Sequence, residues 1–272
     1  WSGSPALLSN PADTNSRAGD PILIGSASGS AATVVWRTQV GASLGQIESN
    51  GFTDGAWANG PTLISLSTGG GANSTDVRAV GSTDGSVVTA VWRTISGGLG
   101  AVYANRFSAS AWGGSPDLIS AAAASTANAQ SAPAIVTNPS GAQVAVAWQS
   151  GVSGNGQIVS SAFASGAWSG PELVSSAAAS AANASAPKLV ASTDLSSVTA
   201  VWQSRNVANG EVYASRRTAG TWAANPTLIS VAAASSTNVQ SLGQVASNPA
   251  GDTVTVVWRS YDQFNGEIYA NR

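Results

Sequence analysis

Arginine, glutamate and tryptophan recur in this chain at fixed spacing, and together these residue types are suited to holding a neutral polyol. A guanidinium donates hydrogen bonds in a planar fork, and a carboxylate accepts them. A tryptophan ring supplies a flat apolar surface on which the apolar face of a sugar can stack. The charged candidates lie just after, or a short way beyond, a repeated tryptophan: Arg37, Glu48, Arg93, Arg259 and Glu267. We expect Arg259 with Glu267 to form the first site and Arg37 with Glu48 the next, although the same side chains could instead join neighbouring repeats.

The ten tryptophans fall into two sets, and within each set the spacing is 54 to 56 residues. One set ends β-branched runs such as Thr33-Val34-Val35-Trp36, so we expect its rings in the core. The other set follows turns rich in Gly, Asp, Ser and Ala, and its rings either pack at an edge or stack on a sugar. The candidates of this second set for ligand binding are Trp57, Trp112, Trp168 and Trp222.

Composition excludes several classes of function. The chain of 272 residues has no histidine and no cysteine, which removes Ser–His–Asp and Cys–His catalysis, disulfides and the usual zinc sites. We therefore expect no metal and no cofactor. Eleven basic residues against thirteen acidic ones give a net charge of −2, too little positive charge for a nucleic-acid partner. No apolar run approaches the roughly 18 residues of a membrane helix, so no membrane insertion is expected.

Carboxylates remain as a route to catalysis. Asp20 and Asp76 occupy equivalent positions in two neighbouring repeats, and a pair of carboxylates is what a glycoside hydrolase requires. The other three repeats carry Ala132, Ala186 and Leu242 at this position. No long insertion builds a substrate cleft. We therefore predict that the protein is not an enzyme, with a glycoside hydrolase as the less favoured alternative.

The elements that position these residues are four strand-like segments in each repeat. A short apolar segment such as Ile22-Leu23-Ile24 leads to a turn such as Ser26-Ala27-Ser28-Gly29, and the run ending in the first tryptophan set follows. A third segment alternates apolar and polar residues with the period of a strand. The fourth begins at the second tryptophan set and runs through Pro-x-Leu-Ile-Ser, where the proline indicates an edge strand.

Five repeats of four antiparallel strands predict an all-β, five-bladed β-propeller formed by a single domain, 1–272. The blades are expected at about 18–65, 73–120, 129–175, 184–230, and 239–272 completed by 1–9. The chain opens with a lone fourth strand and closes with a lone third strand. We expect these two ends to pair and close the ring, because an unpaired edge promotes aggregation. Deleting residues 1–9 should then cost much of the stability.

The pattern Val-Val-Trp-Arg, Gly-x-Ile, an aromatic residue, Trp and Pro-x-Leu-Ile-Ser resembles the blades of fucose-binding fungal and bacterial propeller lectins. It is more similar to repeats of secreted bacterial proteins of unassigned role, through Val102-Tyr103-Ala104-Asn105-Arg106-Phe107 followed by Trp112. The lectin resemblance implies that an Arg, a Glu and a Trp or Tyr hold a sugar between adjacent blades. The match is uneven, because Arg93 stands opposite Ala101 and two blades carry Gln149 and Gln203 in place of arginine.

These observations predict a non-catalytic recognition module whose ligand is a glycan or another cell-surface component. The dominance of Ala, Ser, Gly, Thr and Asn is typical of secreted bacterial proteins, so we expect an extracellular or cell-surface location. The alternative is a structural or protein-binding propeller of the cell surface or of an extracellular assembly, for which self-assembly stays open.

Overall fold

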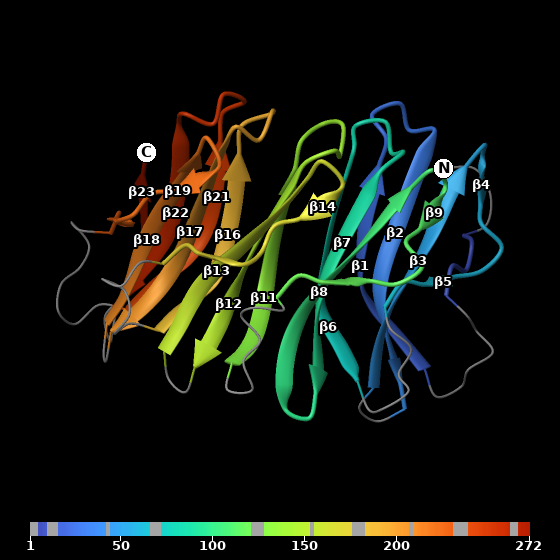
Figure 1. Cartoon of the computed structure of the whole chain (residues 1–272), viewed down its shortest axis with the longest axis horizontal. Helices are drawn as coiled ribbons and strands as arrows, with labels where there is room; N and C mark the ends of the chain where they lie inside the picture. The colour runs from blue at the N-terminus through green and yellow to red at the C-terminus, as the bar shows by residue number, and fades with distance from the viewer. Residues whose placement is uncertain are drawn as a thin grey trace.

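The chain folds almost entirely into β-strands (Figure 1). The computed structural model describes residues 5–9, 16–41, 44–65, 72–120, 128–152, 155–175, 183–206, 209–230, 239–261 and 266–272. Within these ranges no helix is long and apolar enough to cross a membrane. The predicted all-β fold with antiparallel sheets is therefore confirmed.

The strands fall into five repeating groups, which we call blades 1 to 5, and each begins with three long antiparallel strands. One parallel pairing, between Gly45 and Asn73, joins the first two groups into a single sheet. Blade 1 contains β1 (Ser16–Gly25), β2 (Ala31–Val40), β3 (Leu44–Thr53), β4 (Ala56–Trp57) and β5 (Thr62–Leu63). Blade 2 contains β6 (Asn73–Gly81), β7 (Val88–Ser96), β8 (Leu99–Ser108), β9 (Ala111–Trp112) and β10 (Asp117–Leu118). Blade 3 contains β11 (Asn128–Thr137), β12 (Val144–Val152), β13 (Asn155–Ala164), β14 (Ala167–Trp168) and β15 (Glu172–Leu173). Blade 4 contains β16 (Asn183–Ala191), β17 (Ser197–Asn206), β18 (Asn209–Thr218), β19 (Thr221–Trp222) and β20 (Thr227–Leu228). Blade 5 contains β21 (Val239–Ser247), β22 (Val254–Tyr261) and β23 (Gly266–Asn271).

The turns between the first and second strands of each blade form as expected from their sequences. Their last residue has a positive φ, which glycine adopts without steric cost. This φ is 73° at Gly29 and 69° at Gly141, and in blade 4 the non-glycine Leu195 takes the same place at 56°. In every blade the turn therefore ends at the same offset before the tryptophan of the second strand.

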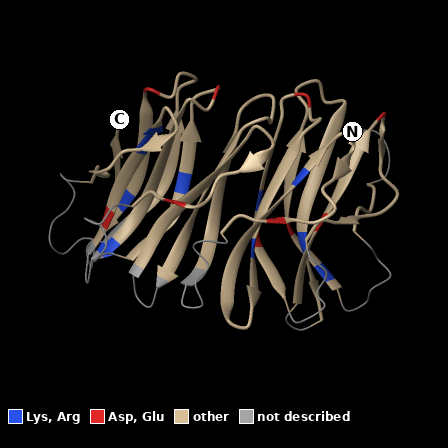
Figure 2. Cartoon of the chain, viewed as in Figure 1, with Lys and Arg blue, Asp and Glu red and all other residues tan. Residues whose placement is uncertain are grey.

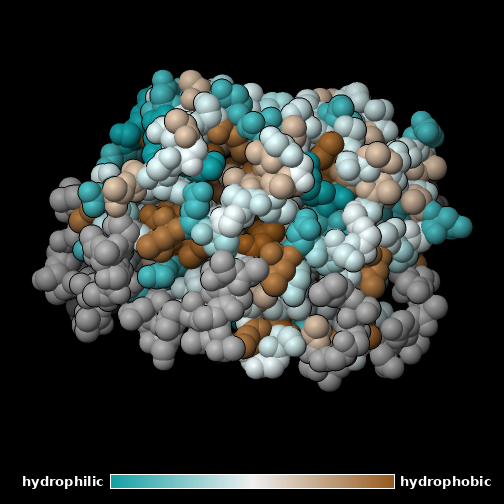
Figure 3. All heavy atoms as spheres, in the orientation of Figure 1, coloured by the Kyte–Doolittle hydropathy of each residue, from teal (hydrophilic) through white to brown (hydrophobic). Residues whose placement is uncertain are grey.

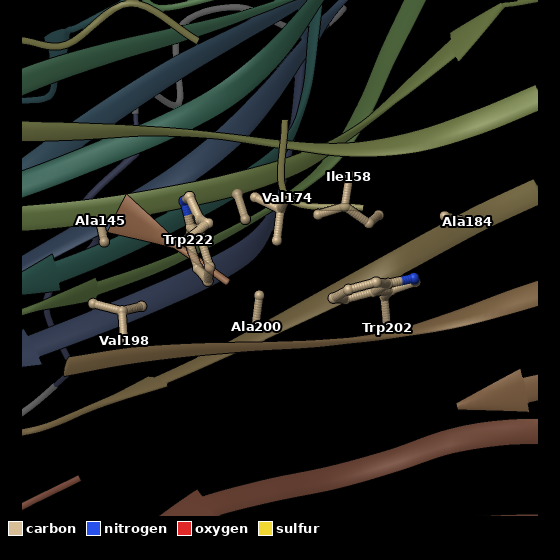
Figure 4. Packing of buried hydrophobic residues seen from close by; sticks show 9 residues of the cluster. Ala145, Ile158, Val174, Ala184, Val198, Ala200, Trp202 and Trp222 are labelled. Carbon is tan, nitrogen blue, oxygen red and sulfur yellow. The ribbon is translucent and has the colours of Figure 1, made fainter. Parts of the chain in front are cut away.

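The core lies between neighbouring blades. Tryptophans of the second strands are buried beside apolar residues of the preceding blade, and Trp92, Trp148 and Trp202 have no exposed surface. In the core between blades 3 and 4, Trp202 and Trp222 pack with Ile158 and Val174 (Figure 4). Similar cores join blades 1 and 2, 2 and 3, and 4 and 5. The predicted place of these tryptophans in the core is thus confirmed.

The fourth segment of each repeat is an interrupted edge rather than one continuous strand. In blade 1, β4 and β5 both pair with β3, and the residues between them include Gly60, with a φ of 105°, and Pro61. A serine shortly after the second short strand of this segment (β5, β10, β15 or β20) adds a hydrogen bond to the third long strand of the blade. The hydroxyl of Ser65 accepts a hydrogen bond from the Ile47 N–H at 3.0 Å, and Ser120 accepts one from Val102 at 2.9 Å. The predicted edge position of this segment is therefore correct, while its continuity is not.

The blades are arranged as in a five-bladed β-propeller. Consecutive first strands contact one another from β1 to β21, and residues of all five line a shared cavity. The two chain ends lie at opposite ends of the long dimension (Figure 1). In the part of the chain that the structure describes, residues 5–9 form no strand and β23 has no partner other than β22. Pairing of the two ends, expected from the sequence, is not present among these residues.

The open edge of blade 5 exposes an apolar side chain that the other blades bury. Ile268 of β23 is 76% exposed, whereas its equivalents Ile47, Val102, Ile158 and Val212 are completely buried. Leu7, in the segment expected to cover β23, is 69% exposed. Elsewhere on the viewed face apolar residues reach the surface in separate patches (Figure 3).

Candidate functional site

Arg37 joins blade 1 to blade 2. Its Nε donates to the carbonyl of Ser74 at 3.1 Å and its Nη2 to the Oδ1 of Asn73 at 3.3 Å. Gly45 makes this approach possible, since a Cβ there would lie 2.9 Å from the arginine Nε and 2.3 Å from the Ser74 carbonyl. The guanidinium therefore bonds to the backbone and a side chain of the neighbouring blade.

Glu48, the expected partner of Arg37, points to the other face of the sheet. Its Oε2 accepts hydrogen bonds from the Trp36 indole N–H at 3.1 Å and from the Thr38 hydroxyl at 2.5 Å. Glu48 stands opposite Trp36 in the strand register, whereas Arg37 stands opposite Ile47. The structure thus does not bring Arg37 and Glu48 together.

Arg259 and Glu267 are likewise on opposite faces of blade 5. Arg259 stands opposite Ile268, and its guanidinium carbon lies 4.8 Å from the centre of the Tyr261 ring. Glu267 stands opposite Ser260 and accepts a hydrogen bond from the Tyr269 hydroxyl. The alternation of side chains along a strand separates the two charged groups.

Arg93 forms an ion pair within blade 2. Its Nη1 lies 3.7 Å from the Oδ2 of Asp76, and both side chains are partly exposed. Asp76 has a φ of 56°, as does the equivalent Asp20 at 54°, and both lie where the register of their strand pair shifts. Asp76 is therefore held against an arginine.

Three tryptophans of the second set pack against a phenylalanine of the third strand. Ring centroids are 5.3 Å apart for Phe52 and Trp57, and the two equivalent pairs lie at 5.7 and 5.4 Å: Phe107 with Trp112, and Phe163 with Trp168. These three indoles are half-buried. Trp222 differs, since it is 9% exposed and its N–H donates to the Ser160 hydroxyl at 2.7 Å. Three of the four candidate rings are therefore partly accessible, although Trp112 and Trp168 also pack against the inter-blade cores, and Trp222 is buried.

Tyrosines stack on the core tryptophans in three blades, a feature that the sequence analysis took for part of a binding site. The ring planes of Trp202 and Tyr213 are 17° apart and their centroids 6.2 Å apart. The Tyr213 hydroxyl donates to Glu211 at 2.9 Å. Burial, together with this carboxylate, raises the pKa of Tyr213 to about 12. The tyrosine stays a neutral donor, and this carboxylate is engaged by its own blade.

Residues of all five blades line a central cavity, which measures about 620 Å³. Each blade contributes one side chain that stands opposite the same position of its second strand: Ile22, Arg78, Ala134, Lys188 and Gln244. A register shift just before this position, present in every blade, sets which residues face inward. The sequence pattern does not single out Arg78 or Gln244, because the repeats differ in kind at other positions too, such as that of Asp20 and Asp76.

Charged residues are sparse and scattered over the blades (Figure 2). Within the described ranges no group of three or more acidic side chains could hold a metal ion. The outer tryptophans and the central cavity are two accessible surfaces of the described residues that combine side chains from several blades.

Comparison with known proteins leaves the family open. No protein-family model and no curated protein sequence matches the chain. An α-L-arabinanase of Penicillium chrysogenum complexed with arabinobiose is 10% identical to this chain, with a TM-score of 0.47. The match covers 92% of this chain and 77% of the arabinanase. A GH43 endo-arabinanase from Bacillus licheniformis is 12% identical over 92% of both chains, with a TM-score of 0.41. An endo-arabinase from Bacteroides thetaiotaomicron is 10% identical over 98% of this chain and 97% of its own, with a TM-score of 0.42. Likenesses this distant assign neither activity nor substrate to this chain.

Proposed function

We propose that this protein is a secreted, non-catalytic recognition module that binds glycans. The observation that carries the proposal is the repetition of one aromatic surface: Trp57, Trp112 and Trp168 are partly buried, with part of each side chain accessible, at equivalent places on three blades. Each indole is held by a neighbouring phenylalanine, which limits the entropy lost when a sugar stacks on it. Repeated weak sites on one rigid body also suit multivalent binding to a surface that displays many copies of a sugar.

The proposal assigns no catalytic role to the carboxylates. Of the two acids at equivalent positions, Asp76 is held by Arg93. Histidine and cysteine are absent from the sequence, so general-base and nucleophilic chemistry of those kinds has no residue to perform it. A glycoside hydrolase would need a pair of carboxylates free to face one glycosidic bond. Absence of hydrolysis of any glycan that binds is the expected result.

The test is a glycan array probed with the labelled protein and with a triple variant, W57A/W112A/W168A. We expect selective binding that is lost in the triple variant and reduced stepwise in the single variants, because each loss lowers avidity. A matched control is Leu99→Ala, which removes an exposed apolar side chain from the β7–β8 hairpin. Unchanged melting temperatures establish that the variants fold. A blank array, or equal binding by the triple variant, would overturn the proposal.

A structural or protein-binding role is the second candidate, and it depends on what covers the exposed Ile268 on β23. We propose that this edge is covered by the chain's own residues 5–9, which completes blade 5 and closes the ring. Sequence supports the pairing: Pro5-Ala6-Leu7-Leu8-Ser9 matches Pro61-Thr62-Leu63-Ile64-Ser65 at a constant offset. The amide of Asn50 reaches the Leu8 carbonyl at 3.5 Å, and in blade 2 Asn105 bonds in the same way to Ile64 at 2.9 Å. In a self-assembling structural protein the same edge would be covered by residues 5–9 of a second copy.

A further inference from the structure

The central cavity carries positive charge without a carboxylate to balance it. Arg78 and Lys188 both line the cavity, and no Asp or Glu of the described residues does. The ion pairs formed in these ranges are Arg93 with Asp76 and Arg217 with Glu172, so neither cavity cation takes part in one. Two cations beside one small space repel each other, and an anion between them offsets that repulsion.

The donors of the two cations are only weakly engaged by the protein. The Nη1 of Arg78 donates to the neighbouring carbonyl of Val77 at 2.7 Å, while the side chain is exposed to the cavity. The Nζ of Lys188 lies 3.5 Å from the Oε1 of Gln244, a long hydrogen bond. Most of the guanidinium fork and two of the three ammonium protons are therefore available for a ligand.

The rest of the wall is apolar and small. Ile22, Ala134, Ile135 and Val245 line the same space. Such a wall excludes water from one side of a ligand and strengthens charge interactions inside. The cationic positions are equivalent to apolar ones in other blades, so the blades differ in kind where they face the cavity. A purely structural ring has no need of this difference.

We propose that the cavity is a binding site for an oxyanion group: a carboxylate, sulfate or phosphate. Arg78 binds two oxygens of the anion through its fork, Lys188 supplies the second charge, and the amide of Gln244 donates a further hydrogen bond. The site is separate from the outer tryptophans, and it would accept either a free anion or the acidic group of a saccharide. Anion binding in the cavity therefore does not depend on glycan binding by Trp57 and its equivalents, and each is tested separately.

The test uses the fact that Lys188 is the only lysine of the chain. The protein is acetylated with an amine-reactive ester at constant ionic strength, with sulfate, phosphate or glucuronate as probe, and modification of Lys188 is followed by mass spectrometry of its peptide. We expect an anion to slow acetylation of Lys188 but not of the N-terminal amine. Protection by glucuronate above that by sulfate and phosphate would identify an acidic sugar as the ligand class, and the reverse order a free inorganic anion. Equal acetylation with and without all three probes would overturn the proposal.

Two variants separate the site from general electrostatics. Arg78→Gln is expected to raise the probe concentration needed for protection by about tenfold or more, because a charge-assisted hydrogen bond is lost. Arg205→Gln removes an exposed cation outside the cavity with the same change in net charge, and it should leave protection unchanged. Melting temperatures check that both variants fold. Equal effects of the two substitutions would show that net charge rather than the cavity attracts the anion, which contradicts the site.

Discussion

Asp84 and Asp194 each hold a turn between the first two strands of a blade. The Oδ1 of Asp84 accepts hydrogen bonds from the Ser82 hydroxyl at 2.6 Å and from the N–H of Ser86 at 3.0 Å. Asp194 is bonded in the same way by Ser192 and Ser196. These bonds favour the charged form and lower the pKa of both carboxyl groups to about 2 from 3.8.

This geometry predicts a pH-dependent loss of stability. Because the folded pKa is lowered, the stabilisation by the two carboxylates is present above about pH 4 and is lost as the pH falls toward 2. The double variant D84N/D194N should therefore unfold at lower urea than the parent at pH 6, and the gap should narrow on acidification. Asp117→Asn, at an exposed acid of β10, controls for the lost charge. A gap that stays constant from pH 6 to pH 2 would contradict the assignment.

The alternation of side chains along a strand shows which residues share a face, and so which of them can meet in one site. Residues two apart share a face, so the separation of Arg259 from Glu267 follows once their strands and register are known. The stacking of Tyr269 on Trp258 follows from the same register. The bond from Arg37 to the Ser74 carbonyl could not be predicted in this way, because it depends on how closely two blades approach at Gly45.

In blades 1 to 4 a serine of the outer edge accepts a hydrogen bond from a backbone N–H of the third strand, and we expect this bond to stabilise the fold. Ser120 is completely buried, and its hydroxyl is the acceptor for the Val102 N–H. Ser120→Ala leaves that buried donor without its partner, which should lower the free energy of unfolding by about 1–3 kcal/mol. Chemical denaturation monitored by tryptophan fluorescence measures the change.

Ser115→Ala provides the matched control, since Ser115 lies exposed in the same segment between β9 and β10. It should change stability by less than about 0.5 kcal/mol. Equal effects of the two substitutions would mean that the Ser120 hydrogen bond contributes nothing specific.

The elements themselves were predicted from sequence where local chemistry determines them. The Gly-containing turns, the β-branched second strands and the alternating third strands all form as expected, because each depends on a periodic pattern or a φ preference within the segment. The interruption of the fourth segment was not predicted. Pro61 has no N–H for the ladder and Gly60 takes a positive φ, so β4 and β5 pair separately with β3.

The five blades follow from the tryptophan spacing, whereas the state of the ring depends on contacts between the chain ends. Backbone bonds link the turns of neighbouring blades: Ala27 donates to Thr83 at 2.7 Å, Thr83 to Pro139 at 2.7 Å, and Thr193 to Pro249 at 2.8 Å. Proline has no N–H, so neither proline can donate to the turn of the next blade. For Pro249 the next blade is blade 1. We propose that closure between blades 5 and 1 depends instead on strand pairing by residues 5–9.

A pair of cysteines tests this closure directly in a chain that has none of its own. In other blades the residues equivalent to Ala6 and Ala270 stand opposite each other, as Thr62 does with Ser49. Such neighbours are close enough for a disulfide. The variant A6C/A270C should therefore oxidise within one chain, give a monomer by size-exclusion chromatography, and gain stability on the order of 5 kcal/mol from the constrained unfolded state.

The A6C/A270C variant also distinguishes ring closure within one chain from pairing between two copies. Disulfide-linked dimers or longer chains would show that residues 5–9 of one copy cover β23 of another, which would replace closure by self-assembly through the exposed Ile268 edge. Free thiols after oxidation would show that neither pairing forms and would contradict closure. The control A6C/T255C places the second cysteine at an exposed position on the neighbouring strand β22, already paired on both sides within blade 5. No intramolecular bond is expected there, because closure places residue 6 against β23 and leaves β22 one strand further away.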